Sequence, residues 1–198
     1  MVDLQGVNVL KDIVVPMASA LIGAAAVLVG GYFTIAMPQR DQRKRESAAA
    51  RFAISAFFEV AHLAGSTIIT QPGQPLGEME TVLRERMIDF LHTIPKFAFQ
   101  LIPLLQEPRG EETFHLMIID LDRRRLLTNL TDADVLFAYG AAATTGLLLG
   151  TSDPESCTKI LATIISSRFQ ELTVFFGVVV DRVLPTRRRE QVQRQISA

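Results

Sequence analysis

Residues 13–37 read IVVPMASALIGAAAVLVGGYFTIAM, twenty-five consecutive positions without a charged side chain. A helix rises about 1.5 Å per residue, so a helix of this length extends roughly 37 Å and exceeds the bilayer's hydrocarbon core of about 30 Å. Its backbone polar groups are satisfied within the helix, as the bilayer requires. The stretch therefore predicts a transmembrane helix over residues 13–37.

Two alternatives to a membrane anchor are a cleaved signal peptide and a helix buried in a protein core. A signal peptide has a basic start, an apolar core of about 7–15 residues and a small-residue cleavage site. Here Lys11 is flanked by Asp3 and Asp12, the apolar run is longer, and no A-x-A site follows it. These features favour the anchor over the signal peptide, and the core helix stays an alternative.

The segment that follows, residues 38–46, is basic and predicts the orientation of the anchor. Its four cations are Arg40, Arg43, Lys44 and Arg45. Lys11 is the single cation before the apolar stretch. Because cytoplasmic flanks carry the excess of Lys and Arg, we expect residues 1–12 outside as a short extracytoplasmic N-terminus and the rest of the chain in the cytoplasm.

Small residues recur at four-residue spacing along the predicted span. Ser19 and Gly23 form one such pair, and Ala26 and Gly30 form another. This spacing lets two helices approach closely in lipid, which predicts helix packing with another membrane protein or with a second copy of the chain. The alternative is that Ala and Gly are simply common in membrane spans.

The composition argues against nucleic acid as a partner. The formal net charge is −1, so no strong overall field attracts phosphate. The C-terminal segment 185–198 is nevertheless basic and includes Arg187, Arg188 and Arg189, with no aromatic residue between them. Together with the cations of residues 38–46, these arginines predict contact with anionic membrane lipid, and the alternative is a solvated tail.

Cys157 is the only cysteine of the chain, which excludes an intramolecular disulfide and a multi-cysteine zinc site. We expect its thiol to behave as a small buried hydrophobic group. The sequence also contains no Gly-rich phosphate loop, dinucleotide fingerprint or hydrolase nucleophile motif. It therefore predicts no enzyme, no catalytic residue and no cofactor.

Residues 47–184 predict an all-α domain, a bundle of about five to six helices. Breakers rich in Pro and Gly at residues 71–75 and 108–110 separate segments with apolar residues at helical spacing. Residues 131–134 predict one helix start, and residues 152–155 predict another with Ser152 as its cap. The expected helices cover residues 47–70, 78–93 and 111–130, and between the last two a short apolar helix, which Pro95 either starts or kinks, extends to residue 106. Two further helices run from the first cap to residue 149 and from the second cap to residue 183.

Two later segments are apolar enough to raise the question of further membrane crossings. Residues 135–149 are uncharged but number only fifteen, too few for a comfortable span. Residues 160–180 are long enough, but Arg168 and Glu171 lie near their middle, where a charge is costly in lipid. We therefore expect two buried helices, with membrane insertion as the alternative, and we expect the β-branched run within 176–180 to be helical too.

Each of the three histidines has an acidic residue three positions earlier, which places the two on one helical face. Glu-x-x-His is the unit that di-iron helical bundles use on two of their four helices. The alternative is that these residues lie on polar stripes that face water, as in most amphipathic helices. We expect no metal; if one binds, its ligands are Glu59, His62, Asp89, His92, Glu112 and His115.

These observations lead to one functional hypothesis and two alternatives. The first is a single-pass membrane protein that acts by binding, as a scaffold or as an accessory or assembly subunit of a larger membrane complex. The second is a membrane-active effector, pore-forming or holin-like, which requires the segments after residue 135 to insert. The third is a metal-binding helical enzyme built on the Glu-x-x-His pairs.

Overall fold

A computed structural model describes residues 37–105 and 107–198. The predicted segment 1–12, residues 13–36 of the predicted span and the small residues at 19, 23, 26 and 30 lie outside the described residues. The chain divides into two compact units, Met1–Glu46 and Ser47–Ala198. In the first, residues 37–46 are helical, and the second contains all the other elements considered below.

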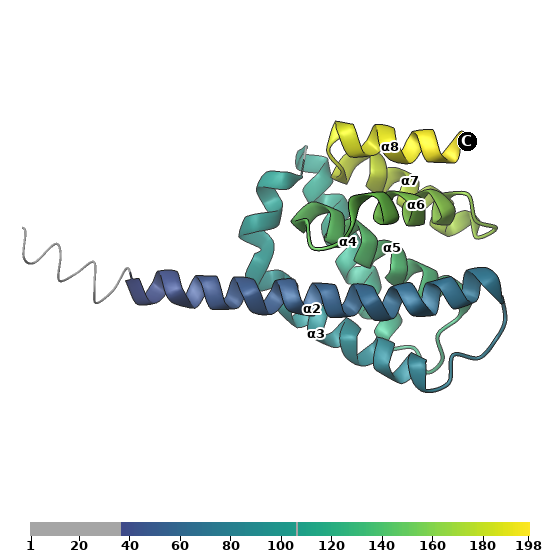
Figure 1. Cartoon of the computed structure of the whole chain (residues 1–198), viewed down its shortest axis with the longest axis horizontal. Coiled ribbons are helices and arrows are strands. Elements are labelled where there is room, and N and C mark those ends of the chain that lie inside the picture. Colours follow the sequence, from purple (N-terminus) through teal and green to yellow (C-terminus); the bar gives the residue numbers. More distant parts are fainter. Residues whose placement is uncertain (1–36, 106) are drawn as a thin grey trace, which may run out of the picture. The chain divides into compact units, whose positions relative to one another are not determined.

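The described part of the chain is entirely helical, which confirms the predicted all-α class. Six of its seven α-helices lie wholly or partly within residues 47–184, and the seventh occupies the C-terminal segment. The elements are α2 (Met37–Thr70), α3 (Glu78–Leu101), the 3-10 helix η3 (Ile102–Leu104), α4 (Pro108–Arg125), α5 (Asp132–Leu149), α6 (Pro154–Ile165), α7 (Gln170–Val183) and α8 (Thr186–Ile196) (Figure 1).

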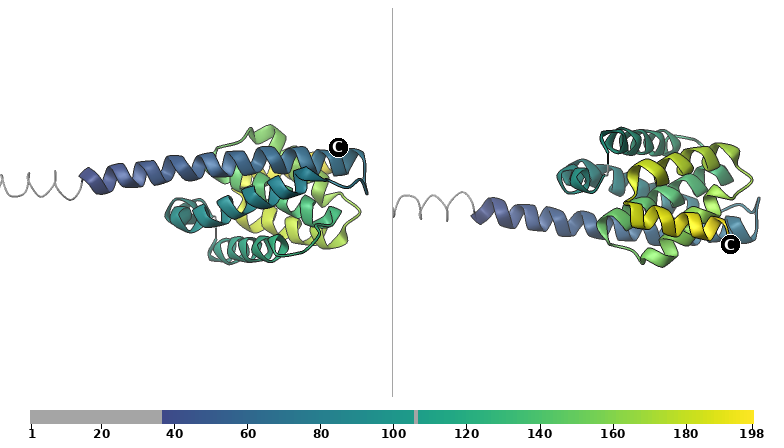
Figure 2. Two further views of the ribbon diagram at one scale, coloured as in Figure 1. Left: turned by 90° about the horizontal axis from the view of Figure 1, so that it is seen from below. Right: turned by 90° about the horizontal axis from the view of Figure 1, so that it is seen from above.

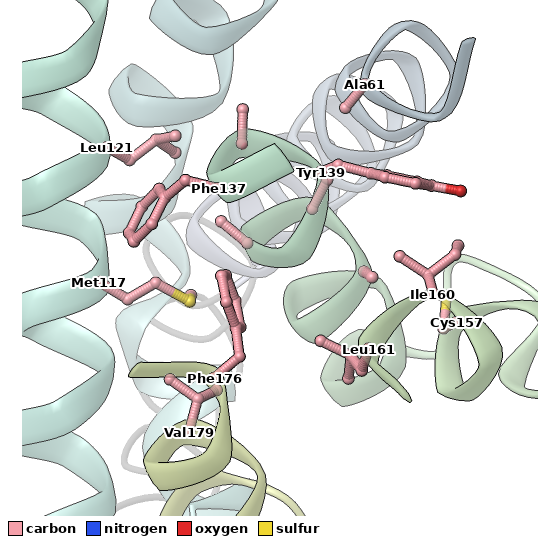
Figure 3. Close-up of a cluster of buried hydrophobic side chains, with 14 of the residues drawn as sticks. Ala61, Met117, Leu121, Phe137, Tyr139, Cys157, Ile160, Leu161, Phe176 and Val179 are labelled. Carbon is pink, nitrogen blue, oxygen red and sulfur yellow. The ribbon is translucent and has the colours of Figure 1, made fainter. Parts of the chain in front are cut away.

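Helix α5 is the central helix of the second unit. Fifteen of its eighteen residues are buried, and α3, α4, α6 and α7 pack against it. Figure 3 shows Phe137 pointing from α5 towards Met117 and Leu121 of α4, with Phe176 of α7 beside it. A helix that is apolar on all sides must be covered on all sides. The prediction that residues 135–149 form a buried helix is therefore confirmed.

The second apolar segment, residues 160–180, is divided between two helices. Helix α6 ends at Ile165 and α7 begins at Gln170, with an exposed Arg168 in the connection. The Ser167 hydroxyl accepts a hydrogen bond from the Phe169 backbone N–H at 3.3 Å, a local alternative to the helical ladder. The expected unbroken helix to residue 183 was therefore wrong, whereas the helical prediction for residues 176–180 is confirmed.

Within the described residues, one helix is long and apolar enough to cross a membrane, and it is α2. The qualifying part is Gln39–Thr70. A third of its most apolar stretch is buried in the protein, because α2 also supplies a core-facing row. The row alternates spacings of four and three: Ala50, Ile54, Phe57, Ala61, Ala64 and Ile68. Length and composition thus support membrane association only weakly here, since a core helix has both.

Other helix ends also differ from those expected. Helix α3 continues past Pro95 to Leu101, so no separate helix begins there. The cap of α6 is Asp153 and not Ser152: its carboxylate accepts the Ser156 N–H at 2.8 Å. That hydrogen bond lowers the pKa of Asp153 below its ordinary value. The basic C-terminal segment is the helix α8, which packs against α6 (Figure 2). Its Val192 is buried.

A partly buried ion pair on α3 holds the end of α4. Arg84 pairs with Glu80 at 2.6 Å and donates to the carbonyls of Arg125 at 2.9 Å and Thr128 at 3.1 Å. Glu80 in turn accepts the Leu130 N–H at 3.1 Å. The carbonyls at a helix C-terminus have no hydrogen-bond donors within the helix, so the Arg84 side chain donates to them instead. The pair fixes the connection between α4 and α5.

Candidate binding groove

The described part of the chain contains an open groove of about 930 Å³. It lies between the C-terminal half of α2, α5, α6 and the connection after α6. This volume is within the range of about 300–1,000 Å³ typical of ligand sites. Its lining residues are His62, Ile68, Ile69, Pro72, Leu136, Tyr139, Ser156, Lys159, Ile160, Ala162, Thr163, Ser166, Ser167, Arg168, Phe169 and Gln195.

The apolar part of the lining comes from three helices. Ile68 of α2, Leu136 of α5 and Ile160 of α6 are all buried and line the groove while they belong to the core. Phe169, in the connection after α6, is half-buried and packs against the same core. Contacts with the hydrophobic core fix these side chains in place. The apolar surface is therefore preformed and does not require a rearrangement to receive a ligand.

His62 and Tyr139 form a polar pair at the groove. The His62 Nδ1 and Tyr139 Oη atoms lie 2.5 Å apart, and Figure 3 shows the tyrosine hydroxyl directed away from the apolar cluster. Burial, followed by the proximity of Cys157, raises the pKa of Tyr139 well above its usual range, so the hydroxyl stays protonated. The tyrosine ring lies directly on Gly65, where a Cβ atom would overlap it.

The charged side chains of the lining are both cationic. Lys159 and Arg168 are exposed, and no Asp or Glu is among the lining residues. Arg168 stacks over the Phe169 ring at 5.1 Å and lies 3.6 Å from Asp132, which offsets part of its charge. The groove thus combines an apolar surface with a positive edge, and it suits an apolar group that carries a negative charge.

The structure does not assemble the three Glu-x-x-His pairs into one site. No group of three or more His, Cys, Asp or Glu side chains in the described residues could hold a metal ion. The pairs lie on three helices: Glu59 and His62 on α2, Asp89 and His92 on α3, Glu112 and His115 on α4. All six residues are exposed. His62 uses its ring nitrogen for Tyr139, and Asp89 accepts from Arg86 at 3.3 Å.

The predicted lipid-contacting cations differ in exposure. The four in the first unit, Arg40, Arg43, Lys44 and Arg45, are all exposed on the first turns of α2. On α8, Arg187 is exposed, but Arg188 and Arg189 are half-buried. Arg188 donates to Gln191 at 2.9 Å. The C-terminal arginines are therefore partly engaged in the fold.

Sequence reasoning found only part of the groove. His62 was singled out because of Glu59, three positions earlier, yet its hydrogen-bond partner is Tyr139, seventy-seven positions later. Arg168 was noted as a charge within an apolar stretch. The one signal for Tyr139 in the sequence was that it is the single tyrosine of a predicted helix made mostly of apolar residues.

The Cys157 thiol is predicted to resist alkylation in the folded protein. Its side chain is fully buried, and burial together with Asp153 raises its pKa to about 12, so little thiolate exists at pH 8. The unfolded thiol titrates near 8.5. We expect iodoacetamide to label the chain at pH 8 only after denaturation, as measured by intact mass. Rapid native labelling would contradict this account.

Because the pKa of the Cys157 thiol is raised in the folded protein, the free energy of unfolding should fall as the pH rises above about 9.

Comparisons with protein-family models, with curated proteins and with solved structures found no match to this chain.

Proposed function

We propose that this chain is a single-pass membrane protein that acts by binding, as a scaffold or accessory subunit of a larger membrane complex. In this proposal residues 13–37 cross the membrane, residues 1–12 lie outside, and the helical domain lies in the cytoplasm. The groove between α2, α5 and α6 receives an apolar segment of the partner that carries one or more carboxylates.

The composition of the groove is the observation that carries this proposal. Apolar side chains anchored in the core, a protonated tyrosine hydroxyl and two cations converge on one preformed hollow. Grooves of this kind receive the anchor side chains of an amphipathic segment, and complementary charges at the edge select and orient it. An accessory subunit requires such a surface on a stable scaffold, which the central α5 provides.

The proposal is tested by affinity purification of the full chain from native membranes, followed by mass spectrometry. We expect the wild type to retain a specific membrane partner and the double variant Lys159→Glu/Arg168→Glu to lose most of it. The matched control is Lys96→Glu/Arg109→Glu, which reverses two exposed cations outside the groove lining. No retained partner, or equal retention by both variants, would reject the groove as the binding surface.

The proposed topology requires a separate reporter, because burial alone protects Cys157 from reagents on either side. Ser166→Cys places a thiol at an exposed position in the connection after α6. In intact cells this thiol should react only with a membrane-permeant maleimide, and an impermeant maleimide should label it after lysis. Labelling by the impermeant reagent in intact cells would overturn the cytoplasmic placement.

A further inference from the structure

One face of α7 presents an ordered series of side chains, of which Phe175 is half-buried and the others are exposed. Glu171, Val174, Phe175, Val178 and Arg182 are separated by three, one, three and four positions, which places them within one side of the helix. The opposite side supplies the core with Leu172, Phe176, Val179, Val180 and Val183. Figure 3 shows Phe176 and Val179 pointing into that core. We call this series of five residues the α7 stripe.

The middle of the α7 stripe is apolar although it faces solvent. Val174 is 63% exposed and Val178 37% exposed. Helix α4 packs beside α7 and adds Leu116, which is 52% exposed, and both helices line a shallow hollow of about 680 Å³. Contiguous exposed apolar surface of this kind marks interaction sites more often than isolated exposed residues do.

The two ends of the α7 stripe carry opposite charges. Glu171 and Arg182 are eleven residues apart, about 16 Å along the helix. Both are exposed, and neither makes an ion pair or a side-chain hydrogen bond with another described residue. The stripe thus has an acid at one end, a base at the other and apolar residues between them. Two such stripes match each other when they are antiparallel, because each acid then meets a base.

We propose that the α7 stripe joins two copies of this chain. A two-fold axis near the middle of the stripe sets the two α7 helices antiparallel, so Glu171 of each copy faces Arg182 of the other while the valines meet between them. Such an isologous interface uses the same surface twice and closes at two subunits. Asp181, at the edge of the stripe, then lies nearest to the uncharged Gln170 of the second copy. This surface is separate from the groove, so the two proposals stand or fall independently.

Charge reversal and rescue test this pairing in the full chain. In mild detergent, light scattering coupled to size exclusion should show a dimer. Glu171→Arg or Arg182→Glu alone should weaken dimerisation about tenfold or more, because each dimer contains two such pairs. The double variant Glu171→Arg/Arg182→Glu should restore it, since the pairs form with exchanged signs. A monomeric wild type, or a dimer that both single variants leave intact, would overturn the proposal, as would a double variant without rescue.

Cross-linking in membranes locates the interface directly. Val178→Cys places a thiol close to the proposed axis, and a short bis-maleimide should convert most of the chain to a covalent dimer. Leu63→Cys is the control, an apolar position on α2 that lies outside the stripe and is more exposed than Val178. The wild type serves as the blank because its Cys157 is buried. Equal cross-linking at residues 63 and 178 would place self-association elsewhere and reject the stripe.

Discussion

Replacing Asp134 with alanine is expected to lower the free energy of unfolding by about 3–5 kcal/mol, the usual cost of removing one member of a buried ion pair. The Asp134 side chain is 8% exposed, and it contacts Arg124 at 2.5 Å. It also accepts the Thr131 N–H at 2.8 Å and so closes a capping box at the helix start that the sequence predicted for residues 131–134. The variant therefore loses a cap. Among the described residues it leaves Asp120 as the remaining ionic partner of the Arg124 guanidinium, which lies over the Phe137 ring.

Thermal and urea unfolding of the full chain, followed by circular dichroism, measure this loss. The matched control is Asp122→Ala, which removes a carboxylate paired with Arg125 on the neighbouring surface of α4. That pair is 31% and 47% exposed, so its removal should cost less than about 1 kcal/mol. If Asp134→Ala is no more costly than Asp122→Ala, the buried pair does not hold α4 to α5.

Replacing Gly140 with valine is expected to destabilise the protein by about 3 kcal/mol. A Cβ atom at this position would overlap the ring of Phe176, which is fully buried and in contact with the rings of Phe137 and Phe175. The ring has no space to yield, so the added atoms force strain into the packing between α5 and α7. The same unfolding measurements test this prediction.

Two alanine variants separate packing from helix propensity. An alanine in place of a helical glycine gains about 1 kcal/mol from propensity alone. At Gly177 a Cβ atom meets nothing within 4 Å, so Gly177→Ala should stabilise the protein by roughly 0.5–1 kcal/mol. At Gly140 the overlap with Phe176 should exceed that gain and reverse the sign. Equal and stabilising effects at both positions would show that α5 and α7 are not in close contact.

The predictions that the structure confirmed rest on local chemistry. The helix start at residues 131–134 and the burial of residues 135–149 each depend on composition or spacing within a few turns. Such features depend on neighbouring residues, so they can be predicted from a single sequence. The all-α class follows for the same reason, because helical periodicity recurs through most of the described chain.

The break between α6 and α7 was missed because no Gly or Pro marks it and the Ser167 hydroxyl that accepts the Phe169 N–H is a weaker local signal. The other features that sequence reasoning missed depend on contacts between distant segments. Helix α8 forms from a basic segment because Val192 is buried on the domain. The groove brings together α2, α5 and α6, and Arg84 of α3 reaches carbonyls more than forty positions away. No local pattern encodes these pairings.

The short connection at residues 166–169 also has a consequence for biosynthesis. A translocon samples an emerging chain for segments of about twenty apolar residues, and residues 160–180 as a continuous run would compete for insertion. Helix α6 has only twelve residues and α7 only fourteen, with a charged turn between them. Each of these helices is shorter than the roughly twenty residues that a membrane-spanning helix needs, so neither is long enough to cross a bilayer alone.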